Sequence, residues 1–399
     1  MPPFFPRKPL PMITRLFKEF FQNEKAGGIV LITCTVLSLI LANSDYSAGY
    51  VGFWEMPLGS HTLTEWINDG LMAIFFLMIG LELEREIYQG ELSNIRDAAL
   101  PGIAALGGML VPAGIYLIFN AGTPASGGAG IPMATDIAFA LAVLSLPGKR
   151  VPAALKVFLT ALAVIDDLGA ILVIAFFYSK GLSWLNLGLA GVLFGGMLLL
   201  NRMKVYNLFP YLIGGAAMWY FMLHSGVHAT IAGVLLAFAI PFGDGSEKSI
   251  SYRLQHFLHQ PVAFLILPLF ALANTAIPVV SGLGEALAHT YSVGIAAGLL
   301  LGKPLGVLLF TFLAVRFGLG RLPSGVGWKL IGGAGMLAGI GFTMSVFITL
   351  LAFDDHQIIN NAKLAILVSS LVAAVVGLGV LMWGLRGRAA VVEGEEEAF

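Results

Sequence analysis

Long runs without a charged side chain recur along the whole chain, and they constrain its fold more than any other feature. A helix that crosses the hydrocarbon core of a membrane needs about 20 apolar residues. Charge-free runs cover residues 26–44, 98–135, 181–201, 205–243, 254–284, 330–353 and 364–385. Apolar segments with only a few charges lie between them, at 66–83, 152–179 and 290–315. We therefore expect an all-α polytopic membrane protein.

The composition excludes other classes of protein. Charged residues make up 11% of the chain and hydrophobic residues 58%, whereas an average globular protein is about 25% charged. A soluble chain of this kind would expose a larger apolar surface than soluble monomers tolerate. The net charge of −1 argues against a nucleic-acid partner, which needs a basic surface. We expect contact with membrane lipid and none with nucleic acid.

The apolar runs divide into about twelve transmembrane helices. Most of the 22 basic residues fall in segments that a cytoplasmic N-terminus would place inside the cell, and this agrees with the positive-inside rule. Both termini are therefore predicted to be cytoplasmic. Residues 1–25 would form an N-terminal segment with a short amphipathic helix, 26–386 the membrane domain and 387–399 an acidic tail. The helices are expected near 26–43, 66–83, 98–119, 127–147, 152–178, 182–200, 205–223, 225–241, 256–275, 290–315, 330–352 and 361–385.

Two of these segments do not have the sequence of a straight helix. Residues 121–135, AGTPASGGAGIPMAT, contain four glycines and two prolines, and residues 331–343, IGGAGMLAGIGFT, contain five glycines. Irregular backbone at membrane depth persists only where it is buried in protein or lines a wet cavity. A pair of interrupted segments in the two halves of a chain is the pattern that marks the binding site of a secondary transporter. Close helix packing by small residues is the alternative explanation.

Four ionisable residues lie deep in otherwise apolar segments: Asp136, Asp166, Asp167 and Lys303. Each costs roughly 2.5–3.5 kcal/mol at the centre of a membrane helix, so such residues usually line an ion or proton pathway. Successive helical residues point about 100° apart, so Asp166 and Asp167 cannot face the same partner. We expect one of them to pair with a cation such as Lys303 and the other to face a cavity.

The oxygen atoms near these residues predict a hard cation as the ligand. Asp carboxylates, the Thr135 hydroxyl and freed backbone carbonyls are ligands of this kind, and the absence of His and Cys from the set argues against zinc or copper. A carboxylate can hold either a sodium ion or a proton. That competition, with alternating exposure of the site, suffices for exchange, and no cofactor beyond the transported ions is expected.

Five motifs resemble the NhaA-type bacterial sodium/proton antiporters, and the similarity extends from about residue 15 to 386. The resemblance implies inverted repeats, in which broken helices 4 and 11 cross. It also implies electrogenic exchange of cytoplasmic sodium or lithium for external protons across the inner membrane, in sodium and pH homeostasis, by a protein that is not an enzyme. Loop 44–65 could form the hairpin that joins homodimers in this family. The motifs are IPMATDIAFALAVLSLPG (131–148), ALAVIDDLGAI (161–171), HSGVHATIAGV (224–234), GLLLGKPLG (298–306) and GIGFTMSVFI (339–348).

The resemblance also assigns roles to residues. Asp166 and Asp167 match the pair that binds ions and protons, and Lys303 matches the lysine that pairs with Asp166. Thr135 and Asp136 match the pair at the break of helix 4, where Asp136 would balance the positive ends of half-helices. Sodium would be held by Asp166, Asp167 and Thr135. The regions that sense pH in the family contain Glu82, Glu86, His256 and His259.

The sequence allows two roles for each of two further residues. His228, placed by the sequence inside the eighth helix, is either a neutral core histidine or a pH-responsive one. Asp69, near the outer end of the second helix, either caps that helix or lies where ions enter.

Two other functions remain as alternatives. An intramembrane aspartyl protease also uses paired aspartates, but its carboxylates converge from different elements, whereas Asp166 and Asp167 are adjacent on one helix. A passive cation channel would need a ring of ligands rather than one asymmetric cluster.

Overall fold

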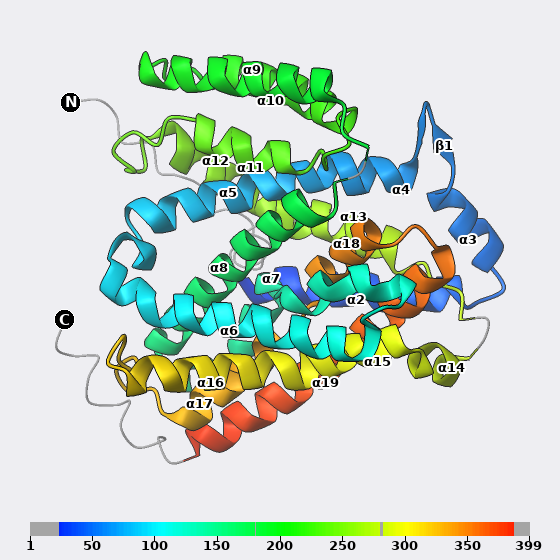
Figure 1. The fold of residues 1–399 in the computed structure, drawn as a ribbon, viewed down its shortest axis with the longest axis vertical. Helices are drawn as coiled ribbons and strands as arrows, with labels where there is room; N and C mark the ends of the chain where they lie inside the picture. Colours follow the sequence, from blue (N-terminus) through cyan, green and yellow to red (C-terminus); the bar gives the residue numbers. More distant parts are fainter. Residues whose placement is uncertain (1–23, 180, 280–281, 387–399) are drawn as a thin grey trace, which may run out of the picture.

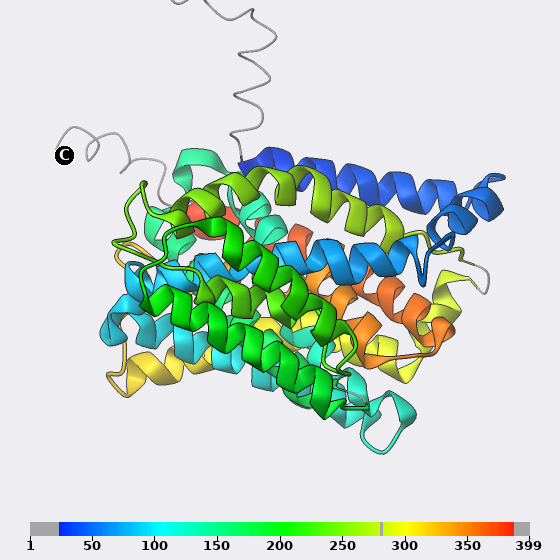
Figure 2. The same cartoon turned by 90° about the horizontal axis from the view of Figure 1, so that it is seen from above.

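The computed structural model describes residues 24–179, 181–279 and 282–386. Most of them lie in helices that run in roughly the same direction (Figure 1), and a view from above shows that these helices stack in several layers (Figure 2). The predicted amphipathic helix within residues 1–25 falls almost wholly, and the acidic tail 387–399 wholly, outside the described residues.

The elements follow the predicted segments closely, and η denotes a 3-10 or π-helix. The first half of the chain contains α2 (Glu24–Ala42), α3 (Ser47–Trp54), β1 (Pro57–Leu58), β2 (His61–Thr62), α4 (Leu63–Trp66), η1 (Ile67–Leu71), α5 (Met72–Tyr88), η2 (Glu91–Ser93), α6 (Ile95–Asn120), η3 (Pro124–Met133), α7 (Ile137–Leu144), η4 (Gly148–Arg150), α8 (Ala153–Phe177) and α9 (Trp184–Arg202). The second half contains α10 (Leu208–Leu223), α11 (Ile231–Ala239), α12 (Ile250–Pro261), η5 (Val262–Ile266), α13 (Leu267–Asn274), α14 (Leu283–Ala288), α15 (Thr290–Ala297), η6 (Gly298–Gly302), α16 (Lys303–Arg316), α17 (Trp328–Ala338), α18 (Phe342–Ala352) and α19 (His356–Leu385).

Seven helices among the described residues are long and apolar enough to cross a membrane. Two bent pairs raise this number to nine: η3 with α7, bent by 42°, and α17 with α18, bent by 44°. These pairs are the two segments that the sequence predicts to be interrupted. The seven helices span Leu63–Tyr88, Ala98–Asn120, Ala153–Phe177, Trp184–Arg202, Ile250–Asn274, Thr290–Arg316 and His356–Leu385.

The expected helix over residues 225–241 is wrong in its first third. The structure has a turn after His224, and α11 begins only at Ile231. Gly226 adopts a φ of +80°, a left-handed conformation that ends a helix and that glycine alone adopts without strain. The Ser225 hydroxyl accepts a hydrogen bond from the Val227 amide at 3.1 Å, which stabilises the turn. His228 therefore lies in this turn and not inside a helix.

The exterior of the bundle is apolar. Ile118, Phe176 and Val192 have 82%, 78% and 72% of their surface exposed. In water this exposure would be unfavourable, whereas in hydrocarbon the same side chains contact lipid. Together with the candidate spans, this surface identifies an integral membrane protein.

The two ends of the bundle differ. One end, here called the hairpin end, carries α3, α14 and the antiparallel pair β1–β2, in which Pro57 faces Thr62. Segment 44–65 thus does form a hairpin. The opposite end, here called the basic end, carries basic residues at helix termini, such as Arg202 at the end of α9 and Arg316 at the end of α16.

Helices α6 and α16 approach each other through glycine. A Cβ atom on Gly306 would collide with the backbone of Gly107, and a Cβ on Gly107 would collide with the backbone of Gly306. Small residues at such crossings let helix backbones come close enough for extensive van der Waals contact in a membrane. This contact matters for the site because α16 begins with Lys303.

We predict that Gly306→Ala lowers the free energy of unfolding by about 1–3 kcal/mol, because the added methyl group forces two backbones apart. Gly191→Ala in α9 is the matched control, since a Cβ there meets open space, and it should leave stability unchanged or slightly higher. Thermal unfolding of both variants in one detergent gives the comparison. Equal midpoints would contradict the close contact.

Candidate ion-binding site

The breaks in the two bent pairs lie against each other. The Asp136 amide, at the end of the first break, donates a hydrogen bond to the Ile340 carbonyl in the second at 2.7 Å. The Thr135 hydroxyl donates to the Ala338 carbonyl, at the end of α17, at 2.9 Å. Backbone groups that each break leaves without helical partners therefore bond to the other break, as the low polarity of a membrane interior requires.

Asp136 caps two half-helices at once. Its Oδ1 accepts from the Phe139 amide of α7 at 3.0 Å. Its Oδ2 accepts from the amide and the hydroxyl of Thr343 in α18, at 3.1 and 2.6 Å. Helix N-termini carry partial positive charge, and this carboxylate lies at two of them. The position is the one expected of a residue that balances half-helix ends.

The 3-10 helix η3 depends on side chains from other spans. Its carbonyls lack the regular partners of an α-helix, and an unpaired carbonyl is costly in a membrane. Four of them accept hydrogen bonds from four different helices or their ends. The pairs are Tyr116 with Ala125, Tyr178 with Gly127, Ser345 with Ile131 and Lys303 with Met133.

Asp166 and Lys303 form a fully buried ion pair. The Lys303 Nζ lies 2.5 Å from Asp166 Oδ2, and both side chains are 0% exposed. The Thr135 hydroxyl lies 2.8 Å from the same oxygen and shares its one proton between this oxygen and the Ala338 carbonyl. One carboxylate oxygen therefore joins α8, α16 and the break after η3. Asp166 Oδ1 is buried and has no hydrogen-bond partner among the described residues.

Asp167 faces in another direction, as the helical rotation of about 100° between neighbours leads one to expect. It lines a cavity of ≈ 620 Å³, whereas Asp166 does not. Asp167 is 1% exposed, and in the described part of the chain its Oδ1 accepts no hydrogen bond. This carboxylate is therefore buried, faces the cavity and retains a free oxygen.

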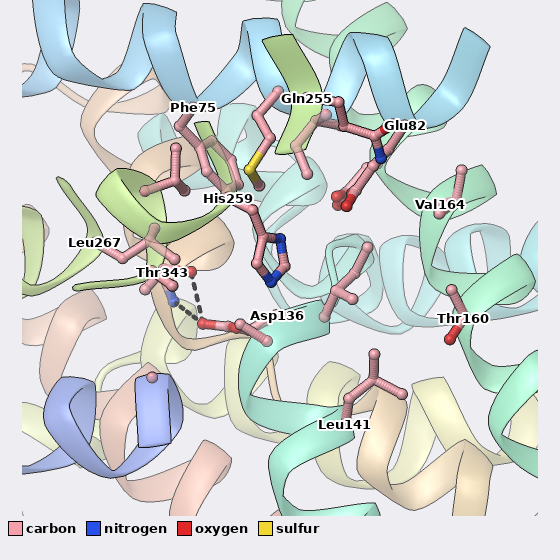
Figure 3. Close-up of a pocket in the computed structure, with 18 of the residues that line it drawn as sticks. Phe75, Glu82, Asp136, Leu141, Thr160, Val164, Gln255, His259, Leu267 and Thr343 are labelled. Carbon is pink, nitrogen blue, oxygen red and sulfur yellow. Dashed lines mark hydrogen bonds between the residues drawn. The ribbon is translucent and has the colours of Figure 1, made fainter. Parts of the chain in front are cut away.

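The cavity collects most of the residues that the sequence singled out. Figure 3 shows Asp136 hydrogen-bonded to Thr343, His259 projecting into the same space and Glu82 on a separate helix. The walls come from α2, α5, α7, α8, α12, η5, α13 and α18. Candidates that line the cavity are Asp136, Asp167, Glu82, Glu86, His256 and His259.

Asp69 and His228 do not line this cavity. Asp69 lies in η1, and its carbonyl accepts from the Trp219 indole at 2.9 Å. The cap of that span is made by Thr62, which forms a capping box with Glu65, so the interpretation of Asp69 as the cap is wrong. His228 Nε2 lies 3.0 Å from the Tyr178 carbonyl, beyond the end of α8.

Sequence reasoning missed Thr343, which both lines the cavity and bonds to Asp136. The signal was present in GIGFT, because a hydroxyl that follows a glycine-rich break can pair with freed polar groups. Tyr178 was also missed. Nothing in its local sequence marks a tyrosine that bonds to a 3-10 helix about 50 residues earlier in the chain.

Comparison with known proteins identifies the family. Residues 18–381 match the model of the Na+/H+ antiporter 1 family. The chain belongs to this family. It is 63% identical over 374 residues to a Na+/H+ antiporter NhaA of Flavobacterium psychrophilum, which covers 94% of this chain and 97% of the relative. A relative of the same name from Cytophaga hutchinsonii is 59% identical over 92% of this chain and 95% of its own length. The family consists of transporters, so the protease alternative is excluded.

We predict that Lys303→Ala lowers the free energy of unfolding by about 3–5 kcal/mol, because it leaves the Asp166 carboxylate buried without its cation. Asp166→Asn in the same chain should recover part of this loss, since the amide carries no charge. Thermal unfolding of the wild type, both single variants and the double variant completes a double-mutant cycle. Simple additivity would mean that the two side chains do not interact.

Proposed function

We propose that Asp167 binds sodium and protons alternately, and that the protein thereby exchanges cytoplasmic sodium or lithium for external protons. The observation that carries this proposal is a buried carboxylate that faces a large cavity and keeps one oxygen without a hydrogen-bond partner among the described residues. Because one carboxylate cannot hold both ions at once, loading one releases the other. Alternate opening of the site to the two sides then couples the two fluxes.

Sodium would be held by oxygen atoms only. Asp167 Oδ1 and Asp166 Oδ1 are buried carboxylate oxygens at the site, and neither accepts a hydrogen bond in the described part of the chain. The Thr135 hydroxyl, which already contacts Asp166, adds a neutral oxygen. A set of carboxylates and a hydroxyl matches the preference of a hard cation.

We further propose that exchange is electrogenic, with more than one proton entering for each sodium ion that leaves. A second proton needs a second group at the site that can exchange protons. The ion pair of Lys303 and Asp166 supplies it, because sodium bound at Asp166 would displace Lys303, whose ammonium could then release a proton. Asp136 would stay charged throughout, since it caps α7 and α18.

The orientation follows from charge. We place the basic end in the cytoplasm of a bacterial cell, with both chain termini there, because basic residues favour that side of the membrane. Glu82, Arg85 and Glu86 near the end of α5 line the cavity, so the cavity would open to the cytoplasm. Four of the five side chains that the sequence offers for pH response, Glu82, Glu86, His256 and His259, line this cavity and would then lie on the path that cytoplasmic ions take.

We also propose the full architecture of the family: twelve spans, inverted repeats and a crossing of the two broken helices. The similar bends of 42° and 44° in η3–α7 and α17–α18, and the hydrogen bonds between their breaks, support it. The hairpin of β1 and β2 supplies an edge through which two copies could form a homodimer.

We predict that Asp167→Asn abolishes sodium/proton exchange without unfolding the protein, because an amide neither carries a transported proton nor neutralises sodium. Asp244→Asn is the control, since Asp244 lies in an exposed loop and its carboxylate accepts hydrogen bonds from neighbouring Ser246, and it should keep wild-type activity. Sodium-driven proton movement in sealed vesicles is the measurement. Robust exchange by inserted Asp167→Asn protein would remove Asp167 from the mechanism, and sodium flux without proton exchange in the wild type would indicate a channel.

We predict that the sodium half-saturation constant rises as pH falls, by about tenfold per pH unit for each proton that sodium displaces. The reason is that both ions compete for the same carboxylate, so protons occupy more of the site at lower pH. The constant should be measured from about pH 6 to about pH 9 in the wild type and in Glu82→Gln/His256→Ala. A separate sensor would shift the pH of maximal rate in the variant and leave this slope unchanged. A wild-type constant that does not move with pH would refute competition.

A further inference from the structure

Lys363 is a buried cation that the ion-binding site does not use. It lies about two turns inside α19 and is 7% exposed. Its Nζ donates to Asn274 Oδ1 at 3.3 Å, and among the described residues no ion pair joins it to a carboxylate. A lysine inside a membrane span is costly and marks a functional position by default.

The partner of Lys363 connects three spans. Asn274, the last residue of α13, is 1% exposed. Its Nδ2 donates to Asn68 Oδ1 at 2.7 Å, and the Asn68 amide lies 3.4 Å from Asn274 Oδ1 in return. Asn68 belongs to η1, a π-helical turn, and such turns within helices occur frequently at functional sites. We call Asn68, Asn274 and Lys363 the outer triad.

The outer triad lies on the far side of an aromatic layer from the cavity. Along α13, Leu267 lines the cavity, Phe270 follows one turn later and Asn274 one turn after that. Phe270 and Phe76 of α5 both lie against Phe347 of α18, with ring centroids 6.5 and 5.2 Å apart. All three rings are at least 98% buried. The triad and this layer therefore separate the cavity from the hairpin end.

Transport requires this closure to part. If the cavity opens to the cytoplasm, Asp167 reaches the outside only when the spans that carry the aromatic layer and the triad separate. The two asparagines would then exchange their mutual hydrogen bond for water, and Lys363 would become hydrated. The asparagine bond stabilises the closed arrangement. The buried ammonium opposes it, because an amide oxygen replaces only part of the hydration of a charge.

We propose that Lys363 is a positioning residue of the transport cycle, which favours outward opening by gaining water when the Asn68–Asn274 contact breaks. The inference rests on the proposed antiport, since it assigns the triad a place in alternating access. It gives the members of the triad opposite effects. Removing the charge stabilises the closed outer side, and removing the asparagine contact opens it.

The test compares sodium half-saturation on the two faces of the membrane, in right-side-out and inside-out vesicles. The apparent constant on one face is the intrinsic constant divided by the fraction of molecules open to that face. Lys363→Met should raise the external constant about tenfold and leave the internal one nearly unchanged, because the inward-open state already predominates. Asn274→Ala should lower the external constant, and the double variant should return toward the wild type. Lys363→Arg, which keeps the charge, should stay closer to the wild type than Lys363→Met.

A labelling experiment measures the equilibrium between the closed and the open outer side without relying on transport. Thr275 is fully buried beside Asn274, and its hydroxyl donates to the Ala271 carbonyl one turn earlier, so Thr275→Cys in a Cys34→Ser chain reports opening of the outer side. A membrane-impermeant maleimide added outside should label it more slowly with Lys363→Met and faster with Asn274→Ala. Asn361→Ala is the control. Asn361 is a buried amide of α19 that bonds to Tyr291 of α15 at 3.0 Å, outside the triad. This variant should change neither the labelling rate nor the sodium half-saturation constants.

Movement of both variants in the same direction, or no change in labelling with either, would overturn the inference. The two variants could instead shift labelling in opposite directions, as expected, while the wild type shows no sodium-driven proton movement. That result would contradict the proposed antiport and not the inference about Lys363. A purely structural role of Lys363 predicts equal loss of activity on both faces and no change in labelling from the outside.

Discussion

The rest of the structure depends on how polar groups are satisfied where two helices break inside the membrane. Hydrocarbon offers no hydrogen bonds, so a break survives only if protein supplies them. The breaks after η3 and α17 supply them to each other, through Asp136 and Ile340 and through Thr135 and Ala338. Side chains from α6, α8, α16 and α18 complete the bonding of η3. The irregular backbone of η3 is therefore tied to four other parts of the bundle.

This connection places the charges of the site. Asp136 lies at the N-termini of α7 and α18, and Lys303 pairs with Asp166, whereas Asp167 has no ion pair and no hydrogen bond to its Oδ1 among the described residues. This carboxylate is the one that we propose to bind sodium and protons. The neighbouring ion pair lies one residue away on the same helix, so any ion at Asp167 acts directly on Lys303 and Asp166. In the mechanism that we propose, binding, release and charge movement would therefore occur within one turn of α8.

Alternating access requires that only a small free-energy difference separate the closed outer side from the open one. The cavity of ≈ 620 Å³ on the side of the basic end already leads to Asp167, whereas an aromatic layer and the outer triad close the other side. Aromatic burial and the asparagine contact favour this closed arrangement, and the buried Lys363 opposes it. In the cycle that we propose, a small difference between such opposing terms would let bound sodium or protons shift the population between states.

The sequence by itself determined the class of fold, the place of most apolar spans and the two interrupted segments. These follow from local composition, because a membrane span needs a continuous apolar run and every buried charge interrupts it visibly. Tertiary structure alone decided that Asp136 serves both α7 and α18, that α11 starts late, that Tyr178 supports η3 and that Lys363 is buried against Asn274. Each of these depends on contacts between residues far apart in the chain, where the partner and not the local sequence sets the environment of the side chain.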